Sequence, residues 1–516
     1  MTILIRHFFG RFFDKESISP QGEPEAGVIQ TLGLLAAPGA FIAILAMPLG
    51  FRNWDLVAFR FQSLSYSMIV MGVVMVFEWD ALFPDCRDYQ ILTPLPLRLW
   101  TLFLAKLAAL GIFLAIFLVD VNFFGVLFWP SIEDGPIWVH LTVVVAAGLF
   151  SALAIAALQG VLVTLFSGAM YRRISICVQT GLMAALVMLF FLTPLIGFAI
   201  EQLCRTNSPY LNWFPGFWFA GLHEQLQPAL RADSTLRGLG PLATRGIWCV
   251  LAIFLSTFLA GYRRHARRVL ETAEPSWKGG FKLSGIVARW LLRDPVESGV
   301  FHFIGQTLAR SVKHRLFLAT YGGFGVALAV MTLAAGDSTL ELPFMLSFVL
   351  ISGLRAAFNF PSELAANWAF QVTETSSVSA YVRGTRKWVA LFAILPLFLL
   401  IAAVDRSLFH FAFGVTASVL LMELLFLDFR KVPFTCSHFP GKVNLVFLSA
   451  IYVFGFTLYS SYLASLEIWL ARTFLGSTLF FLCAAAVLVA LNRWRGEQEQ
   501  LDYEDSGNLA VVTLDI

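Results

Sequence analysis

Four polar side chains stand inside long apolar stretches of this chain, where such side chains are rare. They are Asp120 and Asn122 in "AIFLVDVNFFGVLFW", Gln159 in the next apolar stretch, and Glu423 in "LLMELLFLDF". A charged group in a lipid bilayer costs at least about 2.5–3.5 kcal/mol, so it usually faces a partner or a water-filled cavity. The four residues therefore predict a translocation path, with Asp120 as a candidate proton-binding acid. The alternative is a helix–helix hydrogen bond, or an acid close enough to the membrane surface to be hydrated.

Two long loops hold a second set of polar residues. The first, "FEWDALFPDCRDYQILTPLPLR" (residues 77–98), separates two apolar stretches, and the second opens on "FPSELAANWAF". Asp85 follows Phe-Pro and can cap a short helix, which Pro94 and Pro96 would end. Such a helix suits a protein-binding surface, although a solvated loop would carry the same charges. The residues predicted to bind a partner are Asp80, Asp85, Arg87, Asp88 and Tyr89 in the first loop, and Glu363, Asn367 and Trp368 in the second.

The motifs of common catalytic and metal sites are absent from the sequence. The phosphate-binding pattern G-x-x-x-x-G-K-[ST] does not occur, and "LHEQLQ" supplies His223 and Glu224 without the second histidine of a zinc site. A G-x-S-x-G motif is also missing, and the six cysteines form no C-x-x-C pair. We therefore predict no catalytic residue, no cofactor and no metal. Energy for any transport would come from an ion gradient or from a partner protein.

The composition places these residues in a membrane protein. The chain has 516 residues, of which 58% are hydrophobic and 13% charged, whereas soluble domains carry about 25% charged residues. Its mean hydropathy is +0.76. The formal net charge of +3 is too small to indicate a nucleic-acid partner.

We predict an all-α fold of twelve transmembrane helices with both termini in the cytoplasm. Most of the 36 Lys and Arg residues fall in loops that this orientation places in the cytoplasm, as expected for cytoplasmic loops. The spans lie at about 28–50, 61–77, 101–128, 137–167, 174–200, 244–262, 316–334, 343–359, 387–404, 408–427, 443–462 and 473–491.

The spans form two halves of six with the same rhythm, which predicts an internal duplication. The first half covers residues 1–262 and the second 316–492, joined by a basic cytoplasmic linker (263–315) and followed by a cytoplasmic tail (493–516). Each half begins with an amphipathic stretch, "IRHFFGRFF" or "FHFIGQTLARSVKHR", which suits a helix in the membrane interface. Parallel repeats of this kind are common in transporters.

This arrangement resembles the permease subunits of type-2 ABC exporters. "LTPLPLRLWTLFLAK" is similar to the family's element before the third span, and "LNWFPGFWFAGL" (211–222) is similar to its re-entrant hairpin before the sixth. The resemblance implies a bacterial inner-membrane subunit whose inner loops dock on a separate cytoplasmic ATPase. Two features depart from the family. The second half has only the short loop "ASLEIWLAR" where the hairpin should repeat, and both halves are fused in one chain.

Two other classes of function stay open at this point. One is an ion-coupled secondary transporter, with Asp120 as the coupling acid. The other is a membrane-embedded enzyme or an assembly scaffold. The aromatic residues at 213–218 fit either an interfacial belt or a gate. Membrane lipid is an expected partner in every case, and no oligomeric state is predicted.

Overall fold

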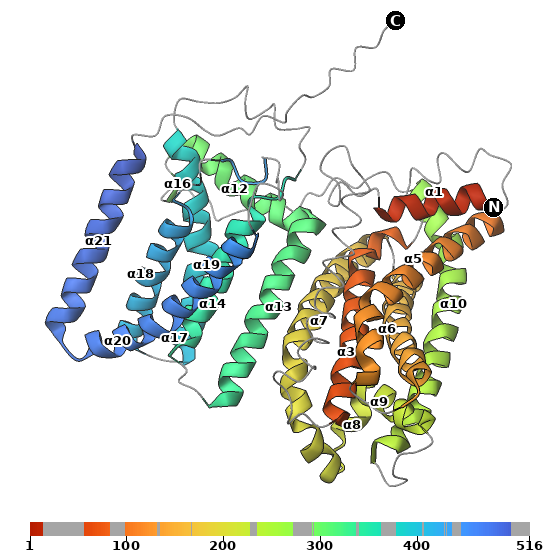
Figure 1. Cartoon of the computed structure of the whole chain (residues 1–516). Coiled ribbons are helices and arrows are strands. Elements are labelled where there is room, and N and C mark those ends of the chain that lie inside the picture. The colour runs from red at the N-terminus through yellow and green to blue at the C-terminus, as the bar shows by residue number, and fades with distance from the viewer. Residues whose placement is uncertain are drawn as a thin grey trace, which may run out of the picture. The chain divides into compact units, whose positions relative to one another are not determined.

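The computed structural model describes residues 1–13, 56–82, 99–131, 135–166, 168–227, 235–271, 291–292, 294–336, 340–362, 378–404, 407–427, 429, 431–435 and 445–496. Every regular element within these residues is a helix, as predicted (Figure 1). The chain divides into two compact units, unit 1 (Met1–Ser276) and unit 2 (Trp277–Ile516). The division falls inside the predicted basic linker.

Unit 1 is a bundle built around helix α3 (Leu56–Phe77), which is buried over most of its length. Helix α3 packs against four other helices of the unit. Its small serine side chains let the helix that contains Gly148 approach closely, and Gly148 faces the Ser67 side chain. The other elements are α1 (Thr2–Phe13), η1 (Trp79–Ala81), α5 (Leu99–Phe128), η2 (Trp129–Ser131), α6 (Ile137–Leu165), α7 (Gly168–Arg205), α8 (Tyr210–Trp213), α9 (Pro215–Leu226), η3 (Thr235–Leu239) and α10 (Gly240–Glu271).

Unit 2 has a core of aromatic and aliphatic side chains between α14 (Leu342–Ala357) and α18 (Leu408–Leu425). Two of its apolar stretches contain π-helical turns, which are rare and often mark functional sites. These turns are η5 (Ala390–Ile394) and η7 (Leu458–Tyr462). The remaining elements are α12 (Pro295–Arg310), α13 (Val312–Ala335), α16 (Val378–Val389), α17 (Leu395–Val404), α19 (Leu445–Thr457), α20 (Leu463–Ala471) and α21 (Phe474–Gly496).

Nine helical stretches within the described residues are long and apolar enough to cross a membrane. Each coincides with a predicted span, and the chain is therefore a multi-pass integral membrane protein. The stretches are Leu56–Phe77, Trp100–Phe128, Ile137–Leu165, Met170–Gly197, Leu236–Gly261, Val312–Ala335, Ala380–Ala402, Leu408–Leu425 and Phe474–Trp494. Of the other three predicted spans, 28–50 lies outside the described residues, 343–359 forms the 16-residue α14, and 443–462 forms α19 and η7.

An amphipathic helix lies at one end of each bundle (Figure 1). In unit 1, α1 packs on α5: Phe8 is fully buried, and the Lys106 ammonium lies 5.0 Å from the centre of its ring. In unit 2, α12 packs on α16, and Asp294 caps α12 by accepting a 2.9 Å hydrogen bond from the Val296 N–H. The opposite ends hold the short helices α9 and α20, and we call them the α9 end and the α20 end.

Candidate functional site

Buried polar side chains gather at the α9 end of unit 1. We call them the α9 cluster, which consists of Arg60, His140, His223, Glu224 and Gln227; all five are buried. Arg60 lies in the first turns of α3 and His140 in the first turn of α6, while the other three lie at the end of α9. Because α3 packs on both α6 and α9, these side chains meet beneath α9.

The charges of the α9 cluster centre on Arg60. Its Nη1 lies 3.6 Å from Glu224 Oε1, and its Nη2 donates a 3.4 Å hydrogen bond to Gln227 Oε1. A guanidinium keeps its proton in proteins, so the base of this pair is always charged. Removing one partner of a buried ion pair is strongly destabilising.

The two histidines of the α9 cluster pack with an aromatic ring. The Trp129 ring lies flat on the His140 ring, with centroids 3.5 Å apart and an interplanar angle of 6°. The His223 ring stands edge-on to both, at 5.6 Å from each centroid. The Ser63 hydroxyl lies 3.4 Å from His140 Nε2. The histidines thus belong to an aromatic stack beside Arg60.

Unit 2 has a different arrangement at its α20 end. His410, in the first turn of α18, contacts Glu467 of α20: His410 Nδ1 and Glu467 Oε1 are 2.6 Å apart. Both side chains are buried, and the edge of the Phe344 ring faces the imidazole. Glu467 Oε2 is also buried and has no hydrogen-bond partner among the described residues. We call these two residues the α20 pair.

Three hydroxyl groups of unit 2 form a buried trio next to the same aromatic ring. The Tyr459 hydroxyl lies 3.2 Å from both Ser347 Oγ and Ser418 Oγ, and the Tyr459 ring packs edge-on against Phe344. Tyr459 belongs to the π-helical turn η7. The widened turn thus holds a hydroxyl against α14 and α18.

Ion pairs connect α16 to α12 and α18 at the end of unit 2 that holds α12, and a hydrogen bond connects it to α21. Glu297 of α12 pairs with Lys387 of α16. Asp294, the residue that precedes α12, has its Oδ2 3.7 Å from Arg383 Nη2. Arg386 pairs with Glu423 of α18 and donates a 2.9 Å hydrogen bond to Asn492 of α21.

Three of the four residues predicted for a translocation path have partners within the protein. Gln159 Nε2 donates to the Trp79 carbonyl at 2.5 Å, which satisfies a free carbonyl just after α3. Asn122 Nδ2 donates to the Leu118 carbonyl of its own helix at 2.8 Å. Glu423 pairs with Arg386. The Gln159 and Glu423 contacts join separate elements, as in the alternative interpretation of the sequence, whereas the Asn122 bond lies within one helix.

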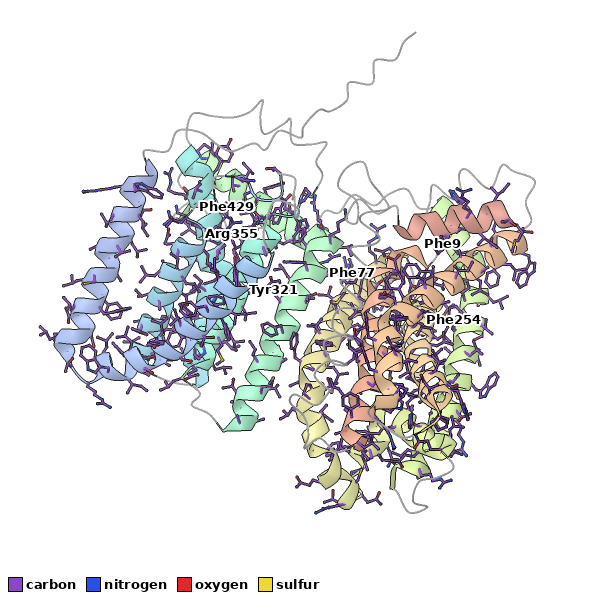
Figure 2. All side chains as sticks on the ribbon, viewed as in Figure 1. Phe9, Phe77, Phe254, Tyr321, Arg355 and Phe429 are labelled. Carbon is purple, nitrogen blue, oxygen red and sulfur yellow. The ribbon has the colours of Figure 1, made fainter. Side chains whose placement is uncertain are left out.

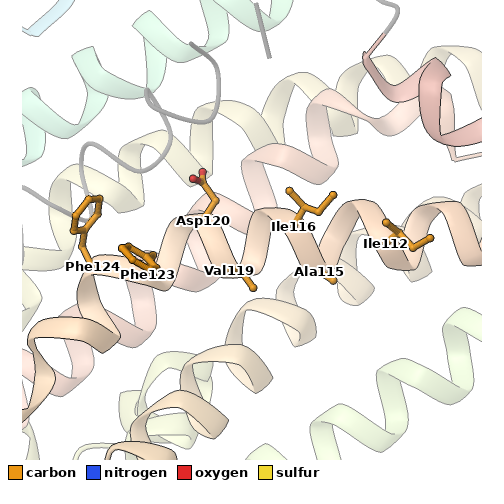
Figure 3. A pocket seen from close by; sticks show the side chains of 7 residues that line it. All are labelled: Ile112, Ala115, Ile116, Val119, Asp120, Phe123 and Phe124. Atoms are coloured by element: carbon orange, nitrogen blue, oxygen red, sulfur yellow. The ribbon is translucent and has the colours of Figure 1, made fainter. Parts of the chain in front are cut away.

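Asp120 is the exception among the four. It borders a groove of about 580 Å³ along α5, together with Ile112, Ala115, Ile116, Val119, Phe123 and Phe124 (Figure 3). Its Oδ2 is shielded from solvent and has no hydrogen-bond partner among the described residues. An acid in an apolar groove of a membrane helix is the arrangement expected of a functional group.

The predicted partner-binding loops fall mostly outside the described residues. Asp80 is described and is exposed in η1. The other predicted positions, Asp85, Arg87, Asp88, Tyr89, Glu363, Asn367 and Trp368, lie outside the described residues.

The described residues at the start of both loops are firmly held. In unit 1, the indole N–H of buried Trp79 donates a 2.8 Å hydrogen bond to Ser175 of α7. In unit 2, the Phe360 carbonyl lies 3.0 Å from His314 Nε2, and the Ser362 N–H donates to the Phe434 carbonyl at 2.9 Å. The Arg355 guanidinium nearby lies over the Phe429 ring, 4.6 Å from its centre (Figure 2).

The aromatic group at the α9 end separates into two parts. Trp213 is 82% exposed, as expected for an aromatic belt at a membrane surface. Phe217 is buried and stacks on Phe61 of α3, with ring centroids 4.6 Å apart. Phe217 is therefore part of the core of unit 1.

Sequence reasoning did not predict the α9 cluster or the α20 pair. His223 and Glu224 drew notice only as an incomplete zinc motif, and the described residues contain no group of three or more His, Cys, Asp or Glu side chains that could hold a metal ion. One feature of the sequence could have indicated these sites. His140 and His410 both lie at the start of the fourth apolar stretch of their half, where a histidine is unusual.

No family model, curated protein or solved structure matches the chain.

Proposed function

We propose that this chain is the membrane permease subunit of an ATP-driven exporter, which forms the translocation path and couples through its loops to a separate ATPase. One observation carries the proposal. In each unit the amphipathic helix packs on the helix that follows a long charged loop: α1 on α5, and α12 on α16. A loop continuous with a clamped helix can pass a force into the bundle, which a solvated loop cannot.

The contacts of α16 support this proposal, because they join α16 to other helices of unit 2. Arg383, Arg386 and Lys387 are three and four residues apart along one helix, so they are close neighbours on its surface. They contact the beginning of α12 and the ends of α18 and α21. A displacement of the loop before α16 would therefore reach three other helices.

The proposal includes twelve spans arranged as two repeats of six, with both termini in the cytoplasm of a bacterial cell. The order of packing supports the repeat. In unit 1, α3 packs on α6, α6 on α10, and α9 on α10; in unit 2, α14 packs on α18, α18 on α21, and α20 on α21. Each unit thus has a short helix packed on its last long helix, at the end away from its amphipathic helix (Figure 1).

The experiment pairs the purified chain with any ATP-binding protein that is encoded beside its gene. We expect the two to co-purify in mild detergent, and we expect the chain to raise the rate of ATP hydrolysis. The double charge reversal Asp85→Lys/Arg87→Glu should weaken binding about tenfold, equal to about 1.4 kcal/mol. Arg205→Glu, an exposed charge at the α9 end, is the matched control and should leave binding unchanged. Failure of the wild-type chain to bind or stimulate any neighbouring ATPase would refute the proposal.

The Asp120 groove favours a second candidate function, an ion-coupled secondary transporter. A carboxylate oxygen that is buried without a partner in an apolar groove is suited to bind and release a proton. In this case a proton gradient alone would drive uptake into vesicles, and Asp120→Asn would abolish it. The double variant Asp120→Asn/Asn122→Asp moves the acid two residues along the same helix. It should not restore uptake if the position in the groove matters. Uptake that needs ATP would exclude this candidate.

A further inference from the structure

We propose that the groove along α5 is a binding site for a lipophilic cation, whose charged group lies at Asp120 and whose apolar part lies along the helix. This inference deepens the proposed transport function, because the fate of the bound ligand rests on that function. Binding itself needs no ATP, no ATPase and no ion gradient, so it can be tested separately.

The groove follows one face of α5. Its seven lining residues, from Ile112 to Phe124, recur at intervals of three and four positions, so their side chains lie on the same side of the helix (Figure 3). With a rise of about 1.5 Å per residue, the lined stretch is about 18 Å long. The volume of about 580 Å³ falls within the range of about 300–1,000 Å³ that is usual for small-molecule sites. The groove therefore suits an elongated small molecule.

Asp120 determines the charge of the ligand. It is the only ionisable side chain among the described residues that line the groove. Its Oδ2 is shielded from solvent and has no hydrogen-bond partner within the part of the chain that the structure describes. A carboxylate without a partner in apolar surroundings is costly, and a cation that pairs with it removes much of that cost. An anion of the same size would be repelled.

The rest of the lining determines the apolar part of the ligand. On one side of Asp120, the aliphatic side chains of Ile112, Ile116 and Val119 are each at least 37% exposed and follow the helix for about 12 Å. On the other side lie Phe123 and Phe124, and the faces of aromatic rings attract cations. An ammonium group beside Asp120, with an alkyl chain along the aliphatic side chains, matches both parts of the groove. Such an amphiphile dissolves in the bilayer that α5 crosses.

Equilibrium binding of tritiated decyltrimethylammonium to the full chain in phosphatidylcholine nanodiscs tests this inference. The probe has a permanent charge, so its binding requires no proton transfer, and empty nanodiscs measure its partition into lipid. We expect saturable binding to the wild type above that level. Asp120→Asn keeps the shape of the side chain and removes its charge, so it should weaken binding about tenfold or more. Glu341→Gln, which removes a half-buried acid just before α14, is the matched control and should bind like the wild type.

A second pair of variants tests the groove while Asp120 stays in place. Ile116→Trp fills the groove and should also weaken binding of the probe about tenfold or more. Leu104→Trp adds the same bulk at an exposed position of α5 outside the groove, and it should leave binding unchanged. Decanol has the same alkyl chain without the charge, and at equal concentration it should not displace the probe.

Two results would overturn the inference: no saturable binding to the wild type, or equal binding to the wild type and Asp120→Asn. Either result would leave the proposed coupling to an ATPase untouched, because the samples contain neither an ATPase nor ATP. Conversely, saturable binding that depends on Asp120 would stand even if no ATPase is stimulated by the chain. The two failures are therefore distinguishable.

Discussion

The α9 end of unit 1 and the α20 end of unit 2 hold a short helix in two different ways. Helix α9 is fastened by the Arg60–Glu224 ion pair and by a glycine contact with η3, where a Cβ atom on Gly221 would lie 2.1 Å from the Leu236 carbonyl oxygen. Helix α20 is fastened by a histidine and a glutamate. Both contacts include a glutamate, so the difference lies in the base: arginine keeps its charge at every pH that proteins meet, whereas histidine can lose its charge.

The comparison teaches that similar positions can serve different purposes. Both fastenings use a side chain from the first turns of a long helix and an acid from a short helix that packs on the last long helix of the unit. In unit 1 the base is an arginine, which is always charged, and a glycine contact with the η3 backbone reinforces the pair. In unit 2 the base is a histidine, which is charged only when it is protonated.

The largest expected effect is at the Arg60–Glu224 pair. Glu224→Ala removes the acid that lies 3.6 Å from the buried Arg60 guanidinium, and we expect a loss of about 3 kcal/mol or more in the free energy of unfolding. Denaturant titration in mixed micelles measures this. The double variant Arg60→Met/Glu224→Leu is the control, because replacing a buried pair with apolar groups is often neutral. Equal losses in both variants would show that the charge is not the cause.

The glycine contact should have the next largest effect. Gly221→Ala brings a methyl group into the η3 backbone, so α9 must shift, at a cost of about 1–3 kcal/mol in unfolding free energy. Gly181→Ala on α7 is the matched control, since nothing lies within 4 Å of its added Cβ atom. That change should stabilise the helix by about 0.5–1 kcal/mol. A loss of stability in Gly181→Ala with none in Gly221→Ala would contradict this account of α9.

The α20 pair should have a smaller effect. Glu467→Gln keeps the size of the side chain but removes the carboxylate that contacts His410, and we expect a loss of about 1–2 kcal/mol in the free energy of unfolding. Denaturant titration in mixed micelles measures this, and Glu341→Gln, half-buried just before α14, is the matched control. Equal losses in both variants would mean that the contact with His410 is not the cause.

The smallest expected effect is at the hydroxyl trio. Tyr459→Phe removes contacts to Ser347 and Ser418, and hydrogen bonds between membrane helices are worth about 0.6 kcal/mol on average. Tyr462→Phe, in the same π-helical turn but 69% exposed, should change the unfolding free energy by less. A loss above about 2 kcal/mol in Tyr459→Phe would mean that the trio supports more than local packing.

The apolar stretches predicted the long helices well, because a span must satisfy its backbone within itself. The stretch "ASLEIWLAR" was expected to be a loop, but Leu463–Ala471 forms α20 directly after η7. It lacks the Pro and Gly residues that mark the start of α9, so its sequence gave no sign of a separate short helix. The buried pairs were beyond prediction for another reason: His410 and Glu467 are 57 residues apart, and only packing brings them together.

Distances between spin labels compare the two fastenings most directly. In a chain without its six native cysteines, one pair of labels joins α20 to α18 at positions 466 and 408, and the other joins α9 to α6 at positions 225 and 141. These positions are exposed and lie outside the fastenings. Glu467→Gln removes the carboxylate that contacts His410, so it should lengthen or broaden the α20–α18 distance and leave the α9–α6 distance unchanged. Changes in both distances, or in neither, would contradict the account.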